Sequence, residues 1–141
     1  MIGTLIARRA IARAFKALDD HDLSTFMSAW REDGTFIYPG QIPESGTYQG
    51  KIAVEGWFRR FFEQFPRIHF NIRDLCVRNL FDMLGNNVIS VHWQIELSNK
   101  EGRNGENHGV TVITIERGKV VLAKDYIFDL GQNFKLNWSA P

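Results

Sequence analysis

The hydrophobic pattern of this chain changes its period at Pro66, and that change decides the fold class. Before Pro66, apolar residues recur every three or four positions, which is the spacing of one helix face. From Ile68 onward, apolar and polar residues alternate, which is the spacing of strands with one buried side. A chain that is helical first and strand-forming afterwards predicts an α+β fold, with helices packed on one face of an antiparallel sheet.

Three helices are expected in the first half of the chain. The first covers residues 4–19, and a short second helix begins after Asp22, a residue type that caps helix N-termini. A short strand at residues 35–38 and a loop at 41–50 follow. The third helix covers residues 51–64 and stops before Pro66. Its apolar face is the strongest in the chain and should lie across the sheet: Val54, Trp57, Phe58, Phe61, Phe62 and Phe65.

Four long strands joined by hairpins are expected in the second half. The first covers residues 68–81, with a bulge where its alternation slips, and a turn at 85–87 leads into the second, centred on residues 89–97. The third covers residues 109–116. The fourth, at 118–129, is apolar on both sides, so it should be a central strand covered on both faces. The tail alternates apolar residues and is expected to be a closing flap or a partner-facing strand: Phe134, Leu136 and Trp138.

Asp125 is the most informative residue for chemistry, because it shares an apolar row of the last strand with Ala123 and Ile127. A carboxylate in such a row is costly unless it is paired, hydrogen-bonded or protonated. Groups perturbed in this way gather at functional sites. The plainer alternative is a core aspartate that accepts a backbone hydrogen bond or pairs with an arginine.

The composition excludes several classes of protein. A length of 141 residues predicts one domain over residues 1–141, with 44% hydrophobic residues to fill its core. The net charge of +1 and the lack of a basic stripe argue against a nucleic-acid-binding protein. No apolar run is long enough to cross a membrane, so no membrane partner is expected. The single cysteine, Cys76, fits a cytoplasmic location. No metal-ligand spacing is present among the histidines.

The order and spacing of several motifs resemble the nuclear transport factor 2-like superfamily, in its SnoaL-like polyketide cyclase branch. The motifs are the helix-to-strand stretch at 22–36, the segment Tyr48-Gln49-Gly50-Lys51, the strand at 88–93, the hairpin at 109–121 and the ending at 125–129. The resemblance implies a cone-shaped curved sheet wrapped around the three N-terminal helices, with an internal apolar pocket. It also implies a homodimer formed through the outer face of the sheet. It implies no single reaction, since this scaffold hosts enzymes and non-catalytic binders.

Catalytic sets found on this scaffold are only partly present here. The residues used by ketosteroid isomerases fall on Ala14, Tyr38 and approximately Thr111, so that apparatus is missing. The Asp-Arg-Asp set of limonene-epoxide hydrolases falls on His92, Gln94 and Asp125, which keeps only the last carboxylate. Scytalone-dehydratase-like members have catalytic residues near His69, Tyr38 and Asp19, but their second histidine falls near Ser98.

The leading hypothesis is a cofactor-free isomerase, cyclase or dehydratase that acts on a small apolar or aromatic molecule. Asp125 and His92 would form the titrating pair, because a neighbouring carboxylate raises the pKa of an imidazole and makes it a general base. Tyr38 or Gln94 would donate a hydrogen bond to a developing oxyanion. Four further residues are candidates for ligand contact, although each also suits an ordinary core or surface position: Trp57, Phe61, His69 and His108.

Two other functional classes stay open. A non-catalytic ligand-binding or dimeric interaction module would explain why the isomerase and hydrolase residues are missing. A subunit that supports a larger enzyme would show a large exposed apolar patch beyond the dimer face.

Overall fold

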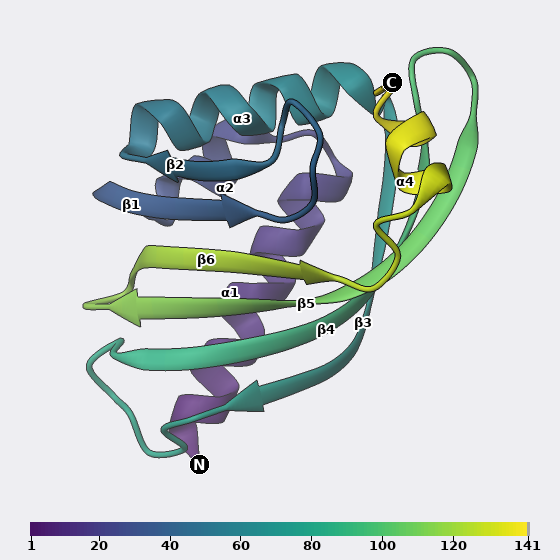
Figure 1. Ribbon diagram of the computed structural model, residues 1–141. Coiled ribbons are helices and arrows are strands. Elements are labelled where there is room, and N and C mark those ends of the chain that lie inside the picture. Colours follow the sequence, from purple (N-terminus) through teal and green to yellow (C-terminus); the bar gives the residue numbers. More distant parts are fainter. Residues whose placement is uncertain (141) are drawn as a thin grey trace.

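The computed structural model describes residues 1–140 and shows helices packed on one side of a six-stranded sheet (Figure 1). The helices are α1 (Ile2–Asp19), α2 (Leu23–Ser28), α3 (Lys51–Gln64) and α4 (Gln132–Asn137). The strands are β1 (Trp30–Tyr38), β2 (Gly46–Gln49), β3 (Arg67–Val77), β4 (Asn87–Ser98), β5 (Asn104–Glu116) and β6 (Lys119–Ile127). The predicted α+β class is confirmed, and the bounds of α3 agree with the prediction.

The sheet is mixed, with strand order β2-β1-β6-β5-β4-β3. The strands β3 to β6 form an antiparallel meander, as predicted, and β1 runs parallel to β6. Several strand bounds differ from the prediction. Strand β1 begins at Trp30, and part of the expected loop at 41–50 forms the edge strand β2. Strand β3 ends at Val77 instead of continuing to residue 81, and β5 begins at Asn104 instead of residue 109. The register of β3 shifts between Ile72 and Asp74, which confirms the predicted bulge. The curved sheet matches a cone-shaped fold.

The helices bury the apolar faces that their spacing predicts. Helix α1 buries a stripe that includes Ala7, Ile11 and Phe15. Helix α2 begins as expected, because the Asp22 carboxylate accepts a hydrogen bond from the Thr25 backbone N–H at 3.1 Å. Helix α3 inserts its aromatic face between the other helices and the sheet, and Trp57 there is only 2% exposed. Aromatic rings of this size dominate the energy of the core.

Strand β6 is central, as predicted, because it lies between β1 and β5. The prediction that both its faces are covered is wrong for the single chain. The helices cover one face only, and Tyr126 on the other face is 51% exposed. A register shift leaves Val121 unpaired between Val120 and Leu122, so Val120 faces inward where Val121 was expected.

The C-terminal tail forms the short helix α4, so the strand expected there is wrong. Phe134 and Trp138 are four residues apart and therefore share one helix face, which is buried. Two buried amides hold the helix in place: Gln64 Nε2 donates to the Asn137 carbonyl at 2.8 Å, and Asn99 Nδ2 donates to the same oxygen at 3.1 Å. Helix α4 thus covers one end of the space between α3 and the sheet (Figure 1).

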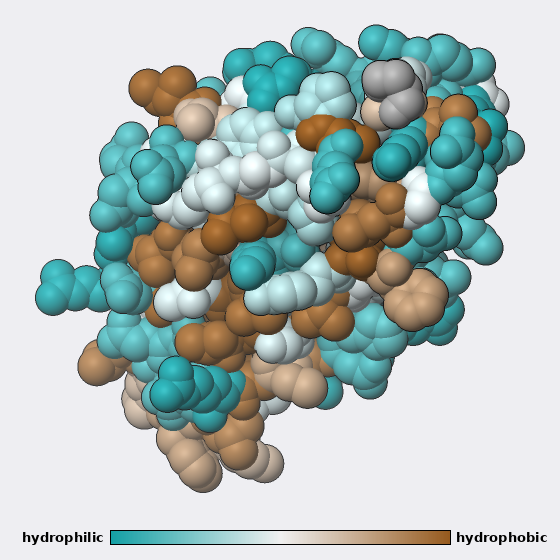
Figure 2. Space-filling model, in the orientation of Figure 1, coloured by the Kyte–Doolittle hydropathy of each residue, from teal (hydrophilic) through white to brown (hydrophobic). Residues whose placement is uncertain are grey.

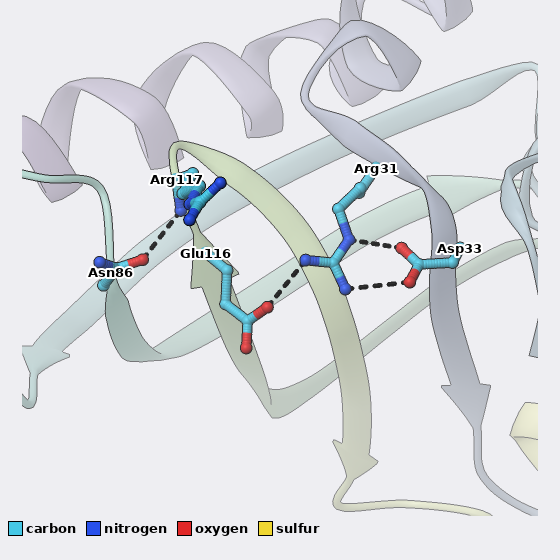
Figure 3. Close-up of polar contacts among 5 residues, drawn as sticks. All are labelled: Arg31, Asp33, Asn86, Glu116 and Arg117. Atoms are coloured by element: carbon cyan, nitrogen blue, oxygen red, sulfur yellow. Dashed lines mark hydrogen bonds and ion pairs between the residues drawn. The ribbon is translucent and has the colours of Figure 1, made fainter.

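Polar contacts connect the turns at the opposite end of the sheet (Figure 3). Arg31 on β1 pairs with Asp33 and, at 2.8 Å, with Glu116 at the end of β5. The side-chain oxygen of Asn86 accepts a hydrogen bond from the Arg117 backbone N–H at 2.9 Å. This second contact holds the β3–β4 loop against the β5–β6 turn. None of the described helices is long and apolar enough to cross a membrane.

Candidate functional site

A cavity of about 150 Å³ lies between the inner face of the sheet and the helices. A cavity of about 150 Å³ can hold a benzene-sized molecule. Most of its wall is aromatic. Three exposed residues on its lining show that it reaches the surface: Ala10 and Gly118, on α1 and the β5–β6 turn, and Glu106 on β5. The cavity lies between the sheet and the helices, where the family resemblance implies an internal pocket. Its aromatic wall includes Phe36, Tyr38, Trp57, Phe61, Trp93 and Trp138.

Asp125 lies on the inner face of β6 and lines this cavity. Its Oδ1 accepts a hydrogen bond from the Thr111 hydroxyl at 2.6 Å, and the Thr111 oxygen accepts one from the Trp93 indole N–H at 2.8 Å. The two bonds form a chain that points the Thr111 proton at the carboxyl. Among the described residues Oδ2 has no hydrogen-bond partner, yet it is not sealed from solvent, so it faces the open space of the cavity.

Strand pairing explains why this chain forms. Thr111 is directly opposite Asp125 in the β5–β6 pair, and Gly109 is directly opposite Trp93 in the β4–β5 pair. Two carbons of the Trp93 ring lie 2.9 and 3.0 Å from where a Cβ on Gly109 would be. The absence of a side chain at Gly109 therefore lets the indole lie across β5 and reach Thr111.

Burial raises the pKa of Asp125 from its ordinary value of 3.8 to about 7, and the hydrogen bond from Thr111 partly opposes this rise. By surface area the residue is only half-buried, because the cavity reaches its free oxygen. The enclosing protein nevertheless keeps most bulk water away from the carboxyl. Since no basic side chain lines the cavity in the described part of the chain, none there offsets the cost of the charge. Asp125 can consequently hold or release a proton near neutral pH.

Tyr38 lies next to Asp125 on the neighbouring strand. In the parallel β1–β6 pair, Phe36 is level with Ala123 and Ile37 with Lys124, so Tyr38 follows as the neighbour of Asp125. Burial raises the pKa of Tyr38 above its usual range, which keeps the hydroxyl protonated. The oxygen accepts a hydrogen bond from the Trp138 indole N–H at 3.0 Å. Its own proton therefore remains free to be donated to a ligand.

The predicted His92–Asp125 pair is wrong, because the two side chains lie on opposite faces of the sheet. The inward row of β4 consists of Val91, Trp93 and Ile95, so His92 points outward and binds Asp74 at 2.9 Å. Gln94 also points outward, where it accepts a hydrogen bond from Arg73. Neither residue can contact a ligand in the cavity.

The two other histidines also lie outside the cavity. His69 is exposed on β3 and contacts the Asp19 carboxylate at 3.2 Å. His108 is exposed on β5 and stacks on Phe128, with 4.6 Å between ring centroids. The prediction that they contact the ligand is not supported by these positions. Trp57 and Phe61 do line the cavity, and the Trp57 indole N–H is already bonded to the Glu44 carbonyl at 3.0 Å.

Sequence reasoning did not identify three residues of the site. Thr111 carries a weak signal, because it is a hydroxyl residue on the apolar side of its strand. Trp93 carries none beyond its large ring, and Trp138 could not be placed because the tail was expected to be extended. Among residues 1–140, no group of three His, Cys, Asp or Glu side chains is arranged to hold a metal ion.

Comparison with known proteins agrees with this geometry. The model of the SnoaL-like domain family matches residues 11–123. No curated protein matches the chain. Similar solved structures include an NTF2-like protein of unknown function from Burkholderia pseudomallei, with 17% sequence identity, a TM-score of 0.74, and coverage of 87% of this chain and 91% of that one.

Two other similar structures were solved with small molecules. One is a hypothetical protein from Catenulispora acidiphila with a ketosteroid isomerase-like fold, in complex with trimethylamine; identity is 14%, the TM-score is 0.72, and coverage is 94% of this chain and 93% of that one. The other is TerC co-crystallised with polyporic acid, at 16% identity and a TM-score of 0.71, with 87% of this chain and 92% of that one covered. At these identities the likeness shows the fold alone. With the family model matching most of its length, the chain belongs to the SnoaL-like domain family, and its fold is that of the NTF2-like structures.

Proposed function

We propose that this protein binds a small cyclic or aromatic-sized organic molecule in the cavity and exchanges a proton with it through Asp125. The reaction class is a cofactor-free isomerisation, cyclisation or dehydration. The observation that carries the proposal is the Asp125 carboxyl, which has one oxygen fixed by Thr111 and the other facing an aromatic cavity. A pKa of about 7 suits a group that both accepts and donates a proton at neutral pH.

The neighbours of Asp125 support this role. Thr111 orients the carboxyl, so Oδ2 is held ready for a proton of the ligand. The free proton of Tyr38 can stabilise negative charge that develops on a ligand oxygen. The aromatic wall excludes water and so strengthens both interactions. The trimethylamine and polyporic acid complexes of two similar structures support a small organic ligand and leave its charge open.

A ligand screen followed by proton exchange tests the proposal. Small cyclic ketones, phenols and quinones are screened by thermal shift, since a ligand that binds the folded state raises its apparent stability. Compounds that bind are then incubated in D2O, and exchange of carbon-bound protons next to the carbonyl is followed by NMR. We expect the protein to accelerate exchange and Asp125→Asn to abolish the acceleration while binding is retained.

A non-catalytic binding module is the second candidate, and one observation favours it. Among residues 1–140, the only carboxylate side chain on the cavity lining apart from Asp125 is the exposed Glu106, and no histidine lines the cavity. In this case the same compounds would bind without any exchange. Asp125→Asn would then change the affinity slightly and remove no activity.

Assembly and location are also part of the proposal. The outer face of the sheet carries an apolar band over β5 and β6, visible as brown surface in Figure 2, and we propose that two copies pair through it. The apolar residues of this band are Val110, Val112, Leu122 and Tyr126, and Lys124 lies among them, opposite Val112. Residues 1–141 would act as one SnoaL-like domain, because all helices share one core with one sheet. The exposed thiol of Cys76 fits the reducing cytoplasm.

A further inference from the structure

An exposed apolar tip lies at the end of the molecule where the N-terminus meets the β3–β4 loop (Figure 1). Helix α1 and the loop are joined there by a hydrogen bond from the Gly3 N–H to the Leu80 carbonyl at 3.0 Å. Figure 2 shows brown and tan surface at this lower end. Phe81, Met83 and Leu84 of the loop are 72%, 70% and 77% exposed. The other exposed apolar members of the tip are Met1, Ile2, Leu5, Ile6 and Leu80.

The loop buries the side chain of Asp82 and turns its apolar side chains to solvent. The Asp82 carboxylate is only 8% exposed and accepts hydrogen bonds from the backbone N–H groups of Leu84 and Gly85, at 3.2 and 3.0 Å. The Asn87 side chain bonds both the N–H and the carbonyl of Asn79. Because the side chains of Asp82 and Asn87 form hydrogen bonds with the backbone of the loop, the loop holds its apolar side chains outward in a defined shape.

The packing at Gly3 also shows that the loop is fixed to the helix. A Cβ on Gly3 would lie 2.7 Å from the Asn79 carbonyl oxygen and 2.8 Å from that of Leu80. Only a residue without a side chain lets the first turn of α1 approach the loop backbone so closely. On its other side the loop is held by the Asn86 contact to Arg117 (Figure 3) and by the Gly118 N–H, which donates to the Gly85 carbonyl at 3.0 Å.

The unpaired charges on α1 and at the start of the loop are positive, whereas Glu116 and Asp33 near the neighbouring turn are paired with Arg31. Arg8 and Arg9 follow on the next turn of α1, and Arg78 precedes the loop; all three are exposed, and none forms an ion pair among the described residues. The first turn of α1 contains no acidic residue. Asp82 is the one acid within the loop, and it is buried and bonded to the backbone. A protruding apolar end with unpaired arginines beside it matches an anionic bilayer surface.

We propose that this tip docks the protein on anionic lipid bilayers, with the loop and the first turn of α1 inserted into the headgroup region. Attachment of this kind lies on the membrane and needs no spanning helix. A second copy of the chain suits the tip poorly, since symmetric contact would bring the unpaired arginines of both copies together. One exposed part of the cavity lining is close to the tip, because Gly118 belongs to the lining and is bonded to Gly85 of the loop. A docked protein could therefore take an apolar ligand directly from the bilayer.

Vesicle co-sedimentation of the full chain tests the proposal. We expect binding to vesicles of equal parts phosphatidylglycerol and phosphatidylcholine, and at least about tenfold weaker binding to pure phosphatidylcholine. The triple variant Phe81→Ser, Met83→Ser and Leu84→Ser should bind the anionic vesicles at least about tenfold more weakly than the unchanged protein. Its control is Ile52→Ser, which removes an 87% exposed apolar residue on α3 and should have no effect.

Two double variants that remove positive charges measure the electrostatic contribution to vesicle binding. Arg8→Gln with Arg9→Gln should weaken binding by about 30-fold, and high salt should do the same to the unchanged protein. The control is Lys100→Gln with Arg103→Gln, on the β4–β5 loop at the far end of the molecule in Figure 1. All these residues are exposed, and thermal unfolding of each variant checks that it is folded.

Three results would overturn the proposal. The protein could fail to bind anionic vesicles, or the triple variant could bind as well as the unchanged protein. Sedimentation velocity could also show that the triple variant turns an oligomer into a monomer, which would make the tip an interface between proteins. None of these results depends on Asp125 or on the ligand of the cavity.

Discussion

Asp125 illustrates what a single buried carboxyl can do when no cation accompanies it. Burial favours its protonated form, Thr111 favours its charged form, and the balance leaves the pKa at about 7. The same residue therefore affects both the stability of the fold and the chemistry of the cavity. Two substitutions separate these effects.

The variant Asp125→Asn should be more stable than the unchanged protein at high pH. Between about pH 4 and pH 7 the folded protein keeps a proton that the unfolded chain has released, so the stability of the unchanged protein falls as the pH rises through this window. Across this window the free energy of unfolding of the unchanged protein falls by at most about 4 kcal/mol, and by less where cavity water solvates the carboxylate. Urea unfolding at about pH 8 and about pH 4 measures it.

Thr114→Val, on the outer face of β5, is the control for that experiment. It removes no ionisable group, so its stability difference should be the same at both pH values. An Asp125→Asn protein that gained no stability at the higher pH would show that the carboxylate is already well solvated or paired.

The variant Thr111→Val should raise the pKa of Asp125 further. The substitution removes the hydrogen bond that favours the carboxylate and leaves the buried Trp93 N–H without its acceptor. The lost partner should lower the free energy of unfolding by about 1–3 kcal/mol. Thr114→Val on the outer face of the same strand is the control. An unchanged Asp125 titration in Thr111→Val would contradict the assigned role of the hydroxyl.

The residues show where sequence reasoning succeeds and where it stops. Asp125 could be identified as a site residue because a carboxylate among apolar neighbours is costly, whichever way its strand pairs. His92 was placed in the cavity on the assumption that the polar side of its strand faces the site. That assumption has no physical basis, because a cavity inside the core is lined by the apolar side of a strand. The inward row of β4 is instead its apolar row, which includes Trp93.

At the scale of elements, β5 controls the site through a residue that has no side chain. Gly109→Ala should lower the free energy of unfolding by about 1–3 kcal/mol, because the new methyl group meets the Trp93 ring and the Tyr126 carbonyl oxygen. Gly56→Ala in α3 is the control: its Cβ meets only the end of the Arg60 side chain at 3.6 Å, and it should stabilise the protein by up to about 1 kcal/mol. Chemical denaturation of both variants tests the contrast.

The elements also differ in how well they could be predicted. Helix α3 was located correctly because its aromatic spacing persists over several turns and Pro66 ends it. Helix α4 has only six residues, and its Phe134, Leu136 and Trp138 suit a period of two as well as a helical one. Tertiary contacts decide between the two, since the buried amides of Gln64 and Asn99 fix the helix from outside.

At the scale of the whole molecule, the sheet has an inner face that the helices cover and an outer face that they leave exposed. Burying the outer apolar band in a dimer would cover the face of β6 that the helices leave exposed. Val112→Lys should then shift the protein toward the monomer, because it would place a second positive charge directly opposite Lys124 within this interface. Sedimentation velocity of Val112→Lys, with Ile52→Lys on α3 as control, checks this. A monomeric unchanged protein would contradict the proposed pairing.

The fold class could be predicted from the sequence because the change of hydrophobic period at Pro66 is a property of long segments. The parallel pairing of β1 with β6 could not, since it joins residues far apart in the chain and depends on the closing of the whole cone. That pairing places Tyr38 beside Asp125, so the arrangement of the site follows from topology more than from any motif.

Direct titration of Asp125 tests the central claim most simply. The carboxyl carbon is observed by NMR in protein labelled at aspartate, and Asp125→Asn identifies its signal. We expect a midpoint of about pH 7, which moves when a ligand from the screen occupies the cavity. A midpoint near the ordinary value of 3.8 that no ligand changes would contradict the claim that Asp125 is a proton-exchanging group in a binding cavity.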